Sequence, residues 1–459
     1  MDSKAPTGTW FDKRELRRLL SLMVPLYIAN LMNMGMGVVD TIVAGRAGAE
    51  QLAGVAMGCA VTAPIMVSIG SILTIIGPMV SRLRGAGCEG KVGYLLNNAH
   101  RLGWLLVVVE MLVLWCAGLV FPYVSDNAEM VRVAQLYLYF LIPAAPASVF
   151  MRGLQGNFEG YGQTRPAMLI SFVGLLLNIP LNFLFVFGWG CIPALGGAGC
   201  GLATTFIHWL MCGVLLALMY ALPQHRLHAR QMLTWRPVDW ALVRKIVGMG
   251  LPLGVASLCE MSFFCVVTLV IAPLGALAVS AQQVAINVSA LVFMFPLSLS
   301  VAVSIRAAYH VGAGNRRGFY AMLGTGAGLM YCVVTLLALG TILFRRDIIA
   351  LYTEDAAIAE LAQFLLVLCA LYQYSDCTQC FMAGLLRGLH DTKVITWACM
   401  ISYWLVGFPL ACILIRTDWL LPAMGPAGAW VSFVVALTVA AVLLSLRFNR
   451  SRKRVFPPL

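Results

Sequence analysis

The sequence predicts an all-α, polytopic membrane protein whose twelve transmembrane helices form two pseudo-symmetric bundles of six. Three observations lead to this prediction. Of the 459 residues, 61% are hydrophobic and 11% are charged, whereas soluble domains carry about 25% charged residues. The apolar stretches are long enough for a helix to cross a bilayer, which takes about 20 residues. The second half of the chain also repeats landmarks of the first.

Apolar stretches between short polar turns place the membrane helices. The segment before the first stretch is polar and basic and leads directly into a full-length span, so we expect no cleaved signal peptide and a cytoplasmic N-terminus. An even number of spans then returns the C-terminus to the cytoplasm. The predicted spans are 19–45, 52–82, 95–121, 131–153, 166–188 and 200–222, followed by 246–273, 277–309, 319–344, 357–385, 394–415 and 427–447.

The basic residues agree with this topology. With the N-terminus inside, 26 of the 31 Lys and Arg residues fall in inner segments and 5 in outer segments, as the positive-inside rule requires. We expect nearly all of them to set the topology and to contact anionic lipid headgroups. Because they lie in short loops and not on one soluble face, we expect no nucleic-acid partner.

An internal repeat divides the chain. A shift of 227 positions places Pro25 on Pro252 and Gly48 on Gly275, and a Gly-Ala-Gly triplet recurs at the same shift. Two halves of six spans in the same orientation imply a pseudo-two-fold axis along the membrane normal. We therefore predict an N-terminal lobe over 1–222, a cytoplasmic linker over 223–245 with a surface-lying amphipathic helix, and a C-terminal lobe over 246–459 that ends in a basic cytoplasmic tail.

Among the carboxylates inside predicted spans we single out four, namely Asp40, Glu110, Glu260 and Asp376. An ionisable group is costly in hydrocarbon, so each is a candidate functional residue that must face protein or water. The alternative is a hydrogen bond that only joins helices, which is common for amides and hydroxyls. Glu110 stands alone in an apolar stretch, and we expect it to face an internal crevice or to pair with a residue that the sequence does not identify.

Polar side chains accompany the carboxylates of the second half. Tyr372 precedes Asp376 by one helical turn on the same face, and Glu260 follows Pro252, which frees a main-chain carbonyl group. In the next span Gln283 and Asn287 are also one turn apart and are expected to line a substrate cavity. Oxygen ligands of these kinds suit Na⁺, and buried carboxylates can equally carry protons. Glu260 and Asp376 are therefore predicted to bind Na⁺ transiently or to bind H⁺.

The first half has its own polar stripe. Asn33 lies two helical turns before Asp40, and Asn178 and Asn182 are one turn apart in a later span. We predict that Asp40 contributes to cation coupling and that the three asparagines line a substrate cavity. The asparagines also fit the alternative of joining helices.

No nucleotide-binding or hydrolase motif is present. The chain lacks the G-x-x-x-x-G-K-[ST], H-E-x-x-H and G-x-S-x-G patterns. We expect neither an enzyme nor a cofactor, and ion coupling remains as the energy source. The 14 cysteines are scattered through apolar stretches and do not form a disulfide framework, although Cys191 and Cys200 flank one predicted outer loop and are able to pair.

Several segments resemble the multidrug and toxic compound extrusion family, and its NorM-type bacterial branch best of all. They are MGVVDTIVAG, the stretch from Pro252 to Glu260, AQQVAINVSALVFMFP, LYQYSD and GLLRGLHDTK. The resemblance runs from about Leu19 to Arg447. One departure is the pair Gln282-Gln283, where the NorM branch often has His-Gln.

The resemblance implies a monomeric antiporter of the bacterial inner membrane that exports cationic, amphipathic drugs or dyes in exchange for Na⁺ or H⁺. A cleft between the two lobes would open alternately to the two sides of the membrane. Membrane lipids would surround the protein. Glu260, Asp376 and Tyr372 would form the second-lobe cation site, and Asp40 with Asn178 and Asn182 the first-lobe site. The alternative is a flippase for lipid-linked oligosaccharides or another lipid, which would need a cationic groove where this chain has acids.

Overall fold

The computed structural model describes residues 11–123, 126–190, 192–234, 236–419 and 422–456. Within these residues, 12 helical segments are long and apolar enough to cross a membrane. The prediction of an all-α polytopic protein with twelve spans is therefore confirmed. The observed helices extend beyond most of the predicted spans, because hydropathy marks only the apolar part of a helix that continues into polar residues. The last span, for example, was expected to end at 447 and continues to Val455.

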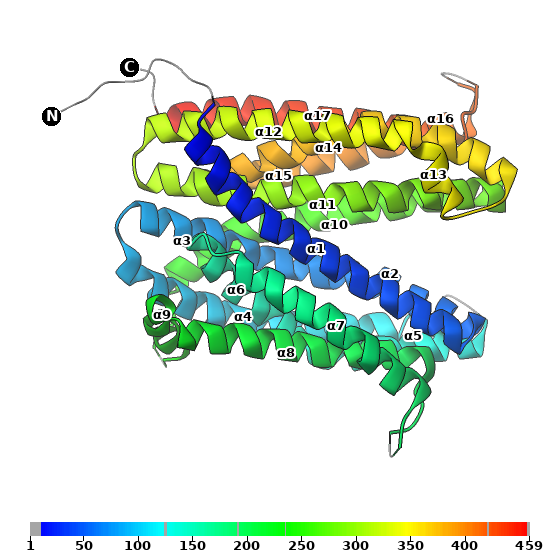
Figure 1. Cartoon of the computed structure of the whole chain (residues 1–459), viewed down its shortest axis with the longest axis horizontal. Coiled ribbons are helices and arrows are strands. Elements are labelled where there is room, and N and C mark those ends of the chain that lie inside the picture. The colour runs from blue at the N-terminus through cyan, green and yellow to red at the C-terminus, as the bar shows by residue number, and fades with distance from the viewer. Residues whose placement is uncertain (1–10, 124–125, 191, 235, 420–421, 457–459) are drawn as a thin grey trace. The chain divides into compact units, whose positions relative to one another are not determined.

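The helices of the first half are continuous or interrupted by short turns of tighter helix (Figure 1). A 3₁₀ turn at Ile72–Ile75 joins α2 to α3, and another at Ile142–Ala144 joins α5 to α6. The bounds are α1 Lys13–Ala47, α2 Ala49–Ser71, α3 Ile76–Gly85, α4 Val92–Gly118, α5 Ala128–Leu141, α6 Ala145–Gly160, α7 Arg165–Phe187, α8 Gly199–Ala221 and α9 Pro223–Leu233.

The second half contains one unusual helix. In its fifth span, a π-helical segment at Met400–Gly407 separates α15 from α16. Pro409 follows this segment, lacks an N–H group and cannot make the regular main-chain hydrogen bond, which favours a local change of winding. The bounds are α10 Trp240–Ile271, α11 Ala276–Gly312, α12 Arg316–Leu343, α13 Arg345–Ala350, α14 Ala356–Gly388, α15 Lys393–Cys399, α16 Phe408–Arg416 and α17 Pro426–Val455.

The sequence repeat is visible in the backbone. The spans Lys13–Ala47 and Trp240–Leu274 both have 35 residues, and Ala49–Gly85 and Ala276–Gly312 both have 37. Gly48 and Gly275 each directly precede one of the two 37-residue spans, and their φ angles are 139° and 99°. Further along, where the repeat shift is 228, Gly162 has φ 77° and its counterpart His390 has φ 62°. The repeat thus places a side chain in a left-handed conformation that usually favours glycine.

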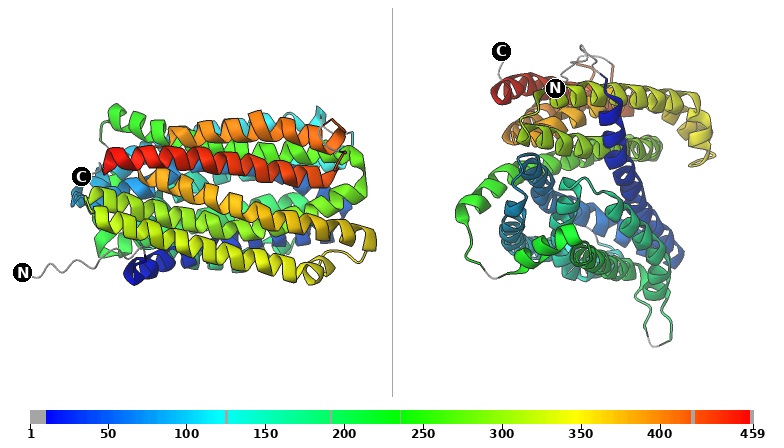
Figure 2. Two further views of the ribbon diagram at one scale, coloured as in Figure 1. Left: turned by 90° about the horizontal axis from the view of Figure 1, so that it is seen from above. Right: turned by 60° about the vertical axis from the view of Figure 1, so that its left-hand side comes forward.

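The helices pack into two compact units (Figures 1 and 2). We call Val24–Leu258 the first-half unit, and Met1–Met23 with Cys259–Leu459 the second-half unit. These boundaries differ from the predicted lobe boundaries at 222 and 246. One reason lies in α10, where a Cβ atom at Gly250 would lie only 2.1 Å from the main-chain oxygen of Ile72. This close approach packs the first half of α10 into the first-half unit.

The linker contains the expected helix, α9, which packs on α4. Asn97 of α4 donates from Nδ2 to the main-chain oxygens of Gln231, Met232 and Thr234 at 3.0, 2.8 and 2.8 Å. His225 lies between the Asn157 amide and Gln163 at 3.1 and 3.0 Å. Burial, with neighbouring positive groups, lowers the pKa of His225 to about 4. The ring is therefore neutral at physiological pH. The hydrogen bonds of Asn97 and His225 together hold α9 to the first-half unit.

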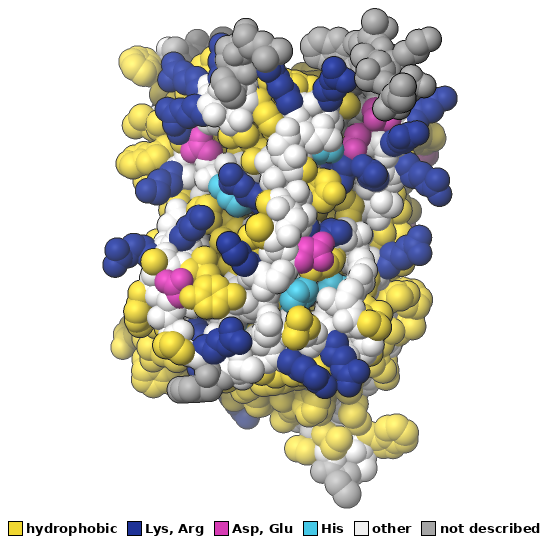
Figure 3. Space-filling model, turned by 90° about the vertical axis from the view of Figure 1, so that its left-hand side faces the viewer, with side chains coloured by type: hydrophobic (Ala, Val, Ile, Leu, Met, Phe, Trp, Pro, Cys, Tyr) yellow, Lys and Arg dark blue, Asp and Glu magenta, His cyan; other side chains and the backbone are white. Residues whose placement is uncertain are grey.

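Basic side chains gather at the helix ends seen in Figure 3, among few acidic ones. The last turn of α3 carries Arg82 and Arg84, and the last turn of α17 carries Arg452, Lys453 and Arg454. This clustering is typical of the cytoplasmic side of a membrane protein. The cytoplasmic placement of the termini stays a prediction.

Candidate ion and substrate sites

Asp40 of α1 is the centre of a buried polar cluster in the first-half unit. Its Oδ1 atom accepts hydrogen bonds from Nδ2 of Asn178 at 3.0 Å and from Nδ2 of Asn182 at 2.6 Å. The two asparagines share a face of α7 because they are four residues apart. The structure therefore brings together three of the residues that the sequence singled out.

The amide oxygens of this cluster are available to a ligand. Among the described residues, Oδ1 of Asn178 and Oδ1 of Asn182 are buried and have no hydrogen-bond partner. Buried polar atoms are nearly always satisfied in folded proteins, so such atoms call for an explanation. Carboxylate and amide oxygens in one place match the ligand preference of Na⁺ and other hard cations.

Sequence reasoning missed two residues beside Asp40. Thr204 of α8 donates from Oγ1 to Oδ2 of Asp40 at 3.4 Å. Cys200 donates from Sγ to the main-chain oxygen of Asp40 at 3.6 Å. Thr204 lies beside Thr205 in a mostly apolar span, and the sequence does not indicate that either residue faces Asp40. Conversely, Asn33 is exposed and is not among the hydrogen-bond partners of Asp40. Cys191, the predicted partner of Cys200, lies outside the described residues.

The second-half unit brings Asp376, Glu260 and Tyr372 together. Asp376 on α14 is 2% exposed and interacts electrostatically with Glu260 of α10. The buried Tyr372, one turn before Asp376, interacts with both carboxylates. Its ring packs edge-on against Trp430 with centroids 5.5 Å apart. The polar face of α14 and the carboxylate of α10 thus meet, as the sequence predicted.

Tyr403 is a further residue at this site that sequence reasoning missed. It lies in the π-helical segment Met400–Gly407, is fully buried and interacts electrostatically with Glu260 and Asp376. Its hydroxyl group has no hydrogen-bond partner within the described residues. Short π-helical segments often occur at functional sites. The only sequence signal is the proline at position 409.

The polar residues of α11 separate into two groups. Gln282 is buried and accepts a hydrogen bond from Nε1 of Trp430 at 2.9 Å. Gln283 is exposed, and its Nε2 donates to Oδ1 of Asn287 at 3.0 Å. Gln282 therefore supports the aromatic wall around Tyr372, whereas Gln283 and Asn287 present amide groups at the surface of the helix.

Glu110 has a partner that the sequence did not reveal. Ser148 of α6 donates from Oγ to Oε1 of Glu110 at 3.0 Å, and Arg152, one turn further along α6, interacts with the carboxylate electrostatically. Glu110 is fully buried, and its Oε2 atom has no hydrogen-bond partner in the described part of the chain. Glu110 was expected either to face an internal crevice or to pair with another residue, and the structure supports the second expectation.

A groove of about 400 Å³ lies between α12, α14 and α17 in the second-half unit. Two pairs of hydroxyl groups join neighbouring helices in its walls. The hydroxyl oxygens of Tyr331 and Thr378 lie 3.3 Å apart, and those of Ser375 and Thr438 lie 2.8 Å apart. None of the predicted site residues lines this groove. The pairs satisfy one another, as is usual for hydroxyl groups that join membrane helices.

Comparison with known proteins identifies the family. The MatE family model matches residues 25–184 and 252–413, so it matches the chain twice, once in each half of the sequence repeat. Two relatives are "Multidrug resistance protein MdtK" of Edwardsiella ictaluri, 36% identical over 438 residues, and that of Yersinia pseudotuberculosis, 37% identical over 446. The first match covers 95% of both chains and the second 96% of both.

Solved structures of MATE transporters share the fold. A multidrug resistance MATE transporter in an outward-facing conformation superposes with a TM-score of 0.84 at 19% identity, over 99% of both chains. A eukaryotic MATE transporter gives 0.83 at 20% identity, over 96% of this chain and 99% of its own. The NorM-type branch stays a prediction, because the relatives above carry the name MdtK. The chain is a multi-pass membrane protein that belongs to the MatE family, the multidrug and toxic compound extrusion family that its motifs resemble.

Proposed function

We propose that this protein is a secondary active antiporter that exports cationic, amphipathic compounds in exchange for Na⁺ or H⁺ by alternating access of two lobes. Its membership of the MatE family and the multidrug resistance names of full-length relatives at 36% and 37% identity support drug export. These relatives are transport proteins, which favours transport over catalysis. A bacterial inner membrane with both termini in the cytoplasm fits the distribution of basic residues.

The observation that carries the ion coupling is a set of carboxylates in membrane spans without basic partners. Asp40 and Asp376 are buried, and Glu260 is partly buried. Within the described residues, Asp40, Glu260 and Asp376 form no ion pair with Lys, Arg or His. A carboxylate in a membrane bundle is costly unless something neutralises it. A mobile cation, either Na⁺ or H⁺, supplies that neutralisation in one part of the transport cycle and a cationic drug in another.

Exchange follows from competition for the same negative charge. A cation that enters the Glu260 and Asp376 site removes the attraction for a cationic drug and favours its release. The two ligands are thus coupled through their different affinities for the two states of the protein. The membrane potential adds about 2.3 kcal/mol per elementary charge per 100 mV, so cation entry drives export when fewer positive charges leave. A flippase for pyrophosphate-linked lipids is disfavoured, because unpaired acids repel such anions.

Ethidium efflux in everted membrane vesicles tests this proposal, with Na⁺ and pH gradients imposed separately. We expect one gradient to drive ethidium transport in the wild type, and Asp376→Asn to abolish it at unchanged protein abundance. Glu360→Gln is the matched control, because Glu360 lies on the same helix and is exposed. Ethidium transport that ignores both gradients, or a fully active Asp376→Asn variant, would contradict the proposal.

A further inference from the structure

The first turns of α1 pack within the second-half unit, although α1 continues into the first-half unit from Val24. Leu19 is fully buried, and its Cδ1 atom would lie 3.6 Å from a Cβ atom at Gly326 of α12. Just before the helix begins, the main-chain N–H of Asp12 donates to Oγ1 of Thr325 at 2.9 Å. Apolar and main-chain contacts therefore hold this segment against α12.

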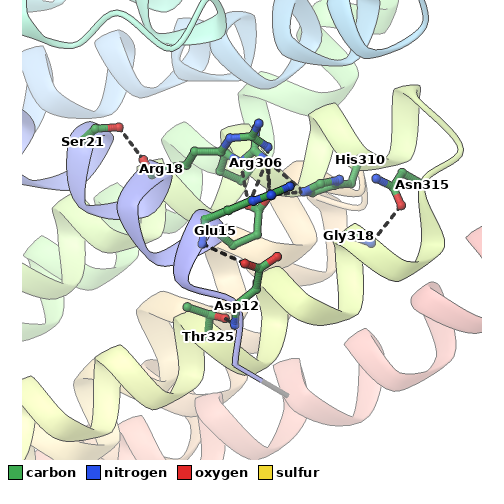
Figure 4. Close-up of polar contacts among 10 residues, drawn as sticks. Asp12, Glu15, Arg18, Ser21, Arg306, His310, Asn315, Gly318 and Thr325 are labelled. Atoms are coloured by element: carbon green, nitrogen blue, oxygen red, sulfur yellow. Dashed lines mark hydrogen bonds and ion pairs between the residues drawn. The ribbon is translucent and has the colours of Figure 1, made fainter. Parts of the chain in front are cut away.

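A buried ion cluster, which we call the α1 anchor, joins the same segment to α11 (Figure 4). It consists of Glu15, Arg306 and His310. Nε of Arg306 donates to Oε2 of Glu15 at 3.1 Å, and Nη2 donates to Oε1 and Oε2 at 2.6 and 2.8 Å. Nη2 also lies 3.0 Å from Nε2 of His310. The same imidazole nitrogen lies 3.4 Å from Oε1 of Glu15, so the imidazole contacts both members of the pair.

The geometry of the anchor is that of a strong contact. Guanidinium and carboxylate groups joined by more than one hydrogen bond are held in a fixed orientation. Glu15 is 4% exposed and Arg306 9%, and separating such a pair leaves an uncompensated buried charge. Arg18, whose side chain is 58% exposed, adds a contact to Oε1 of Glu15 at 3.1 Å. The anchor therefore resists opening far more than an exposed ion pair would.

The same helix also carries Asp40. The segment Lys13–Ala47 is one helix of 35 residues, and its main-chain hydrogen bonds prevent it from stretching. Its start belongs to the second-half unit, whereas Asp40 hydrogen-bonds to Asn178 and Asn182 in the first-half unit. A displacement of the second-half unit at Arg306 is therefore passed along α1, unless the helix bends at Pro25 or the anchor breaks.

We propose that Glu15, Arg306 and His310 are positioning residues that stay joined throughout transport and pass movement of the second-half unit along α1 to the Asp40 cluster. This inference rests on the antiport function proposed above. None of the three anchor residues is among the candidate ion and substrate residues described above. Its loss should slow turnover and leave the affinity for drug unchanged, because the start of α1 no longer follows the second-half unit.

The test combines ethidium efflux in everted vesicles with hydrogen exchange of the segment 13–23 in the purified protein. In the wild type we expect slow amide exchange of this segment with or without ethidium and coupling ion. Glu15→Gln should exchange faster and should lower the maximal efflux rate about ten-fold, with unchanged KM for ethidium. The charge swap Glu15→Arg with Arg306→Glu should restore both readouts. Arg132→Gln, which removes an exposed ion pair at 3.6 Å, is the control.

The outcomes separate this inference from the proposed function. If the wild type exports no ethidium under either gradient, the antiport function fails. If the wild type transports and Glu15→Gln matches its rate at equal abundance, the anchor has no role in transport. Exchange of segment 13–23 that rises in the wild type on adding ethidium or ion would show that the anchor opens, which also overturns the proposal. Should Glu15→Gln fail to insert, Arg306→Lys keeps the charge, loses the paired hydrogen bonds and is expected to show the same loss of rate.

Discussion

Glu15 and Asp376 are both buried carboxylates of the second-half unit, and their surroundings are opposite. Glu15 accepts several hydrogen bonds from the guanidinium group of Arg306. Asp376 has another carboxylate, Glu260, as its electrostatic neighbour. A fixed basic partner satisfies a buried charge permanently, whereas a site of like charges needs a cation that comes and goes. The first arrangement suits a structural tie and the second suits ion coupling.

Asp40 and Asp391 show the same contrast. Asp40 accepts from neutral groups of Asn178, Asn182 and Thr204. Asp391 lies in a loop and accepts from Nε of Arg447 at 2.7 Å. Desolvation raises the pKa of Asp391, but the hydrogen bonds from Arg447 and Ser451 outweigh it and leave the pKa below its ordinary value. Removing an acid of each kind should therefore have different consequences, for transport in one case and for stability in the other.

A large effect on transport is also expected from Asp40→Asn. The amide is close in size to the carboxylate and can still accept from Asn178 and Asn182, so the protein should remain folded, but the negative charge is lost. We expect ethidium efflux to fall about 100-fold at unchanged thermal stability in detergent. Near-normal efflux by a folded Asp40→Asn protein would remove Asp40 from the group of ion-coupling acids.

The largest effect on stability is expected from Arg306→Ala. This change leaves Glu15 buried without its guanidinium partner, which typically costs about 3 to 5 kcal/mol. Thermal unfolding of the purified protein in detergent measures this loss. Arg132→Ala, at an exposed ion pair, should change the free energy of unfolding by about 1 kcal/mol or less. Equal effects of the two variants would contradict the distinction between the anchor and an exposed pair.

An intermediate effect is expected from Asn182→Ala. Nδ2 of Asn182 donates to Asp40 at 2.6 Å, and its buried Oδ1 is available to an ion. A hydrogen bond to a charged group contributes about 1.5 to 3 kcal/mol, so the concentration of coupling ion for half-maximal efflux should rise about ten-fold or more. Asn33→Ala is the control, since Asn33 is exposed and not among the partners of Asp40. A larger shift for Asn33→Ala would reverse the roles assigned to these residues.

The smallest effect is expected from Asp391→Asn, and it should depend on pH. The folded-state pKa of Asp391 lies below its ordinary value of 3.8, so the charged form stabilises the fold above that pH and the contribution is lost as the pH falls through the folded value. We expect the variant to be about 1 kcal/mol less stable at pH 7 and to approach the wild type in acid. A difference that stays constant between pH 7 and pH 3 would rule out the charge as its cause.

Local patterns in the sequence were sufficient for much of this structure. Hydropathy places the twelve spans because a membrane helix is apolar along its own length. Helical spacing places Tyr372 beside Asp376 and Asn178 beside Asn182, because residues four apart share a face. The repeat identified the shift that the family model and the helix lengths later reproduced.

Contacts between distant segments were not predictable in this way. Glu15 and Arg306 are 291 positions apart, and nearly all basic residues were expected to set the topology and to contact lipid. Thr204 lies beside Thr205 and Tyr403 beside Ser402 in mostly apolar spans, and nothing in the local pattern links either residue to a carboxylate of another helix. The unit boundaries at Met23 and Leu258 depend on such distant contacts, and a periodic pattern carries no information about them.

The contrast between unpaired and paired acids is tested most directly by ion release from the purified protein. Ethidium is added to the protein in weakly buffered detergent solution, and the released H⁺ or Na⁺ is measured with a pH indicator or an ion-selective electrode. The account predicts that ethidium displaces the coupling ion from the wild type and from Glu360→Gln, and that Asp376→Asn releases markedly less. Equal release from the wild type and from folded Asp376→Asn would contradict the claim that the unpaired carboxylates hold the coupling ion.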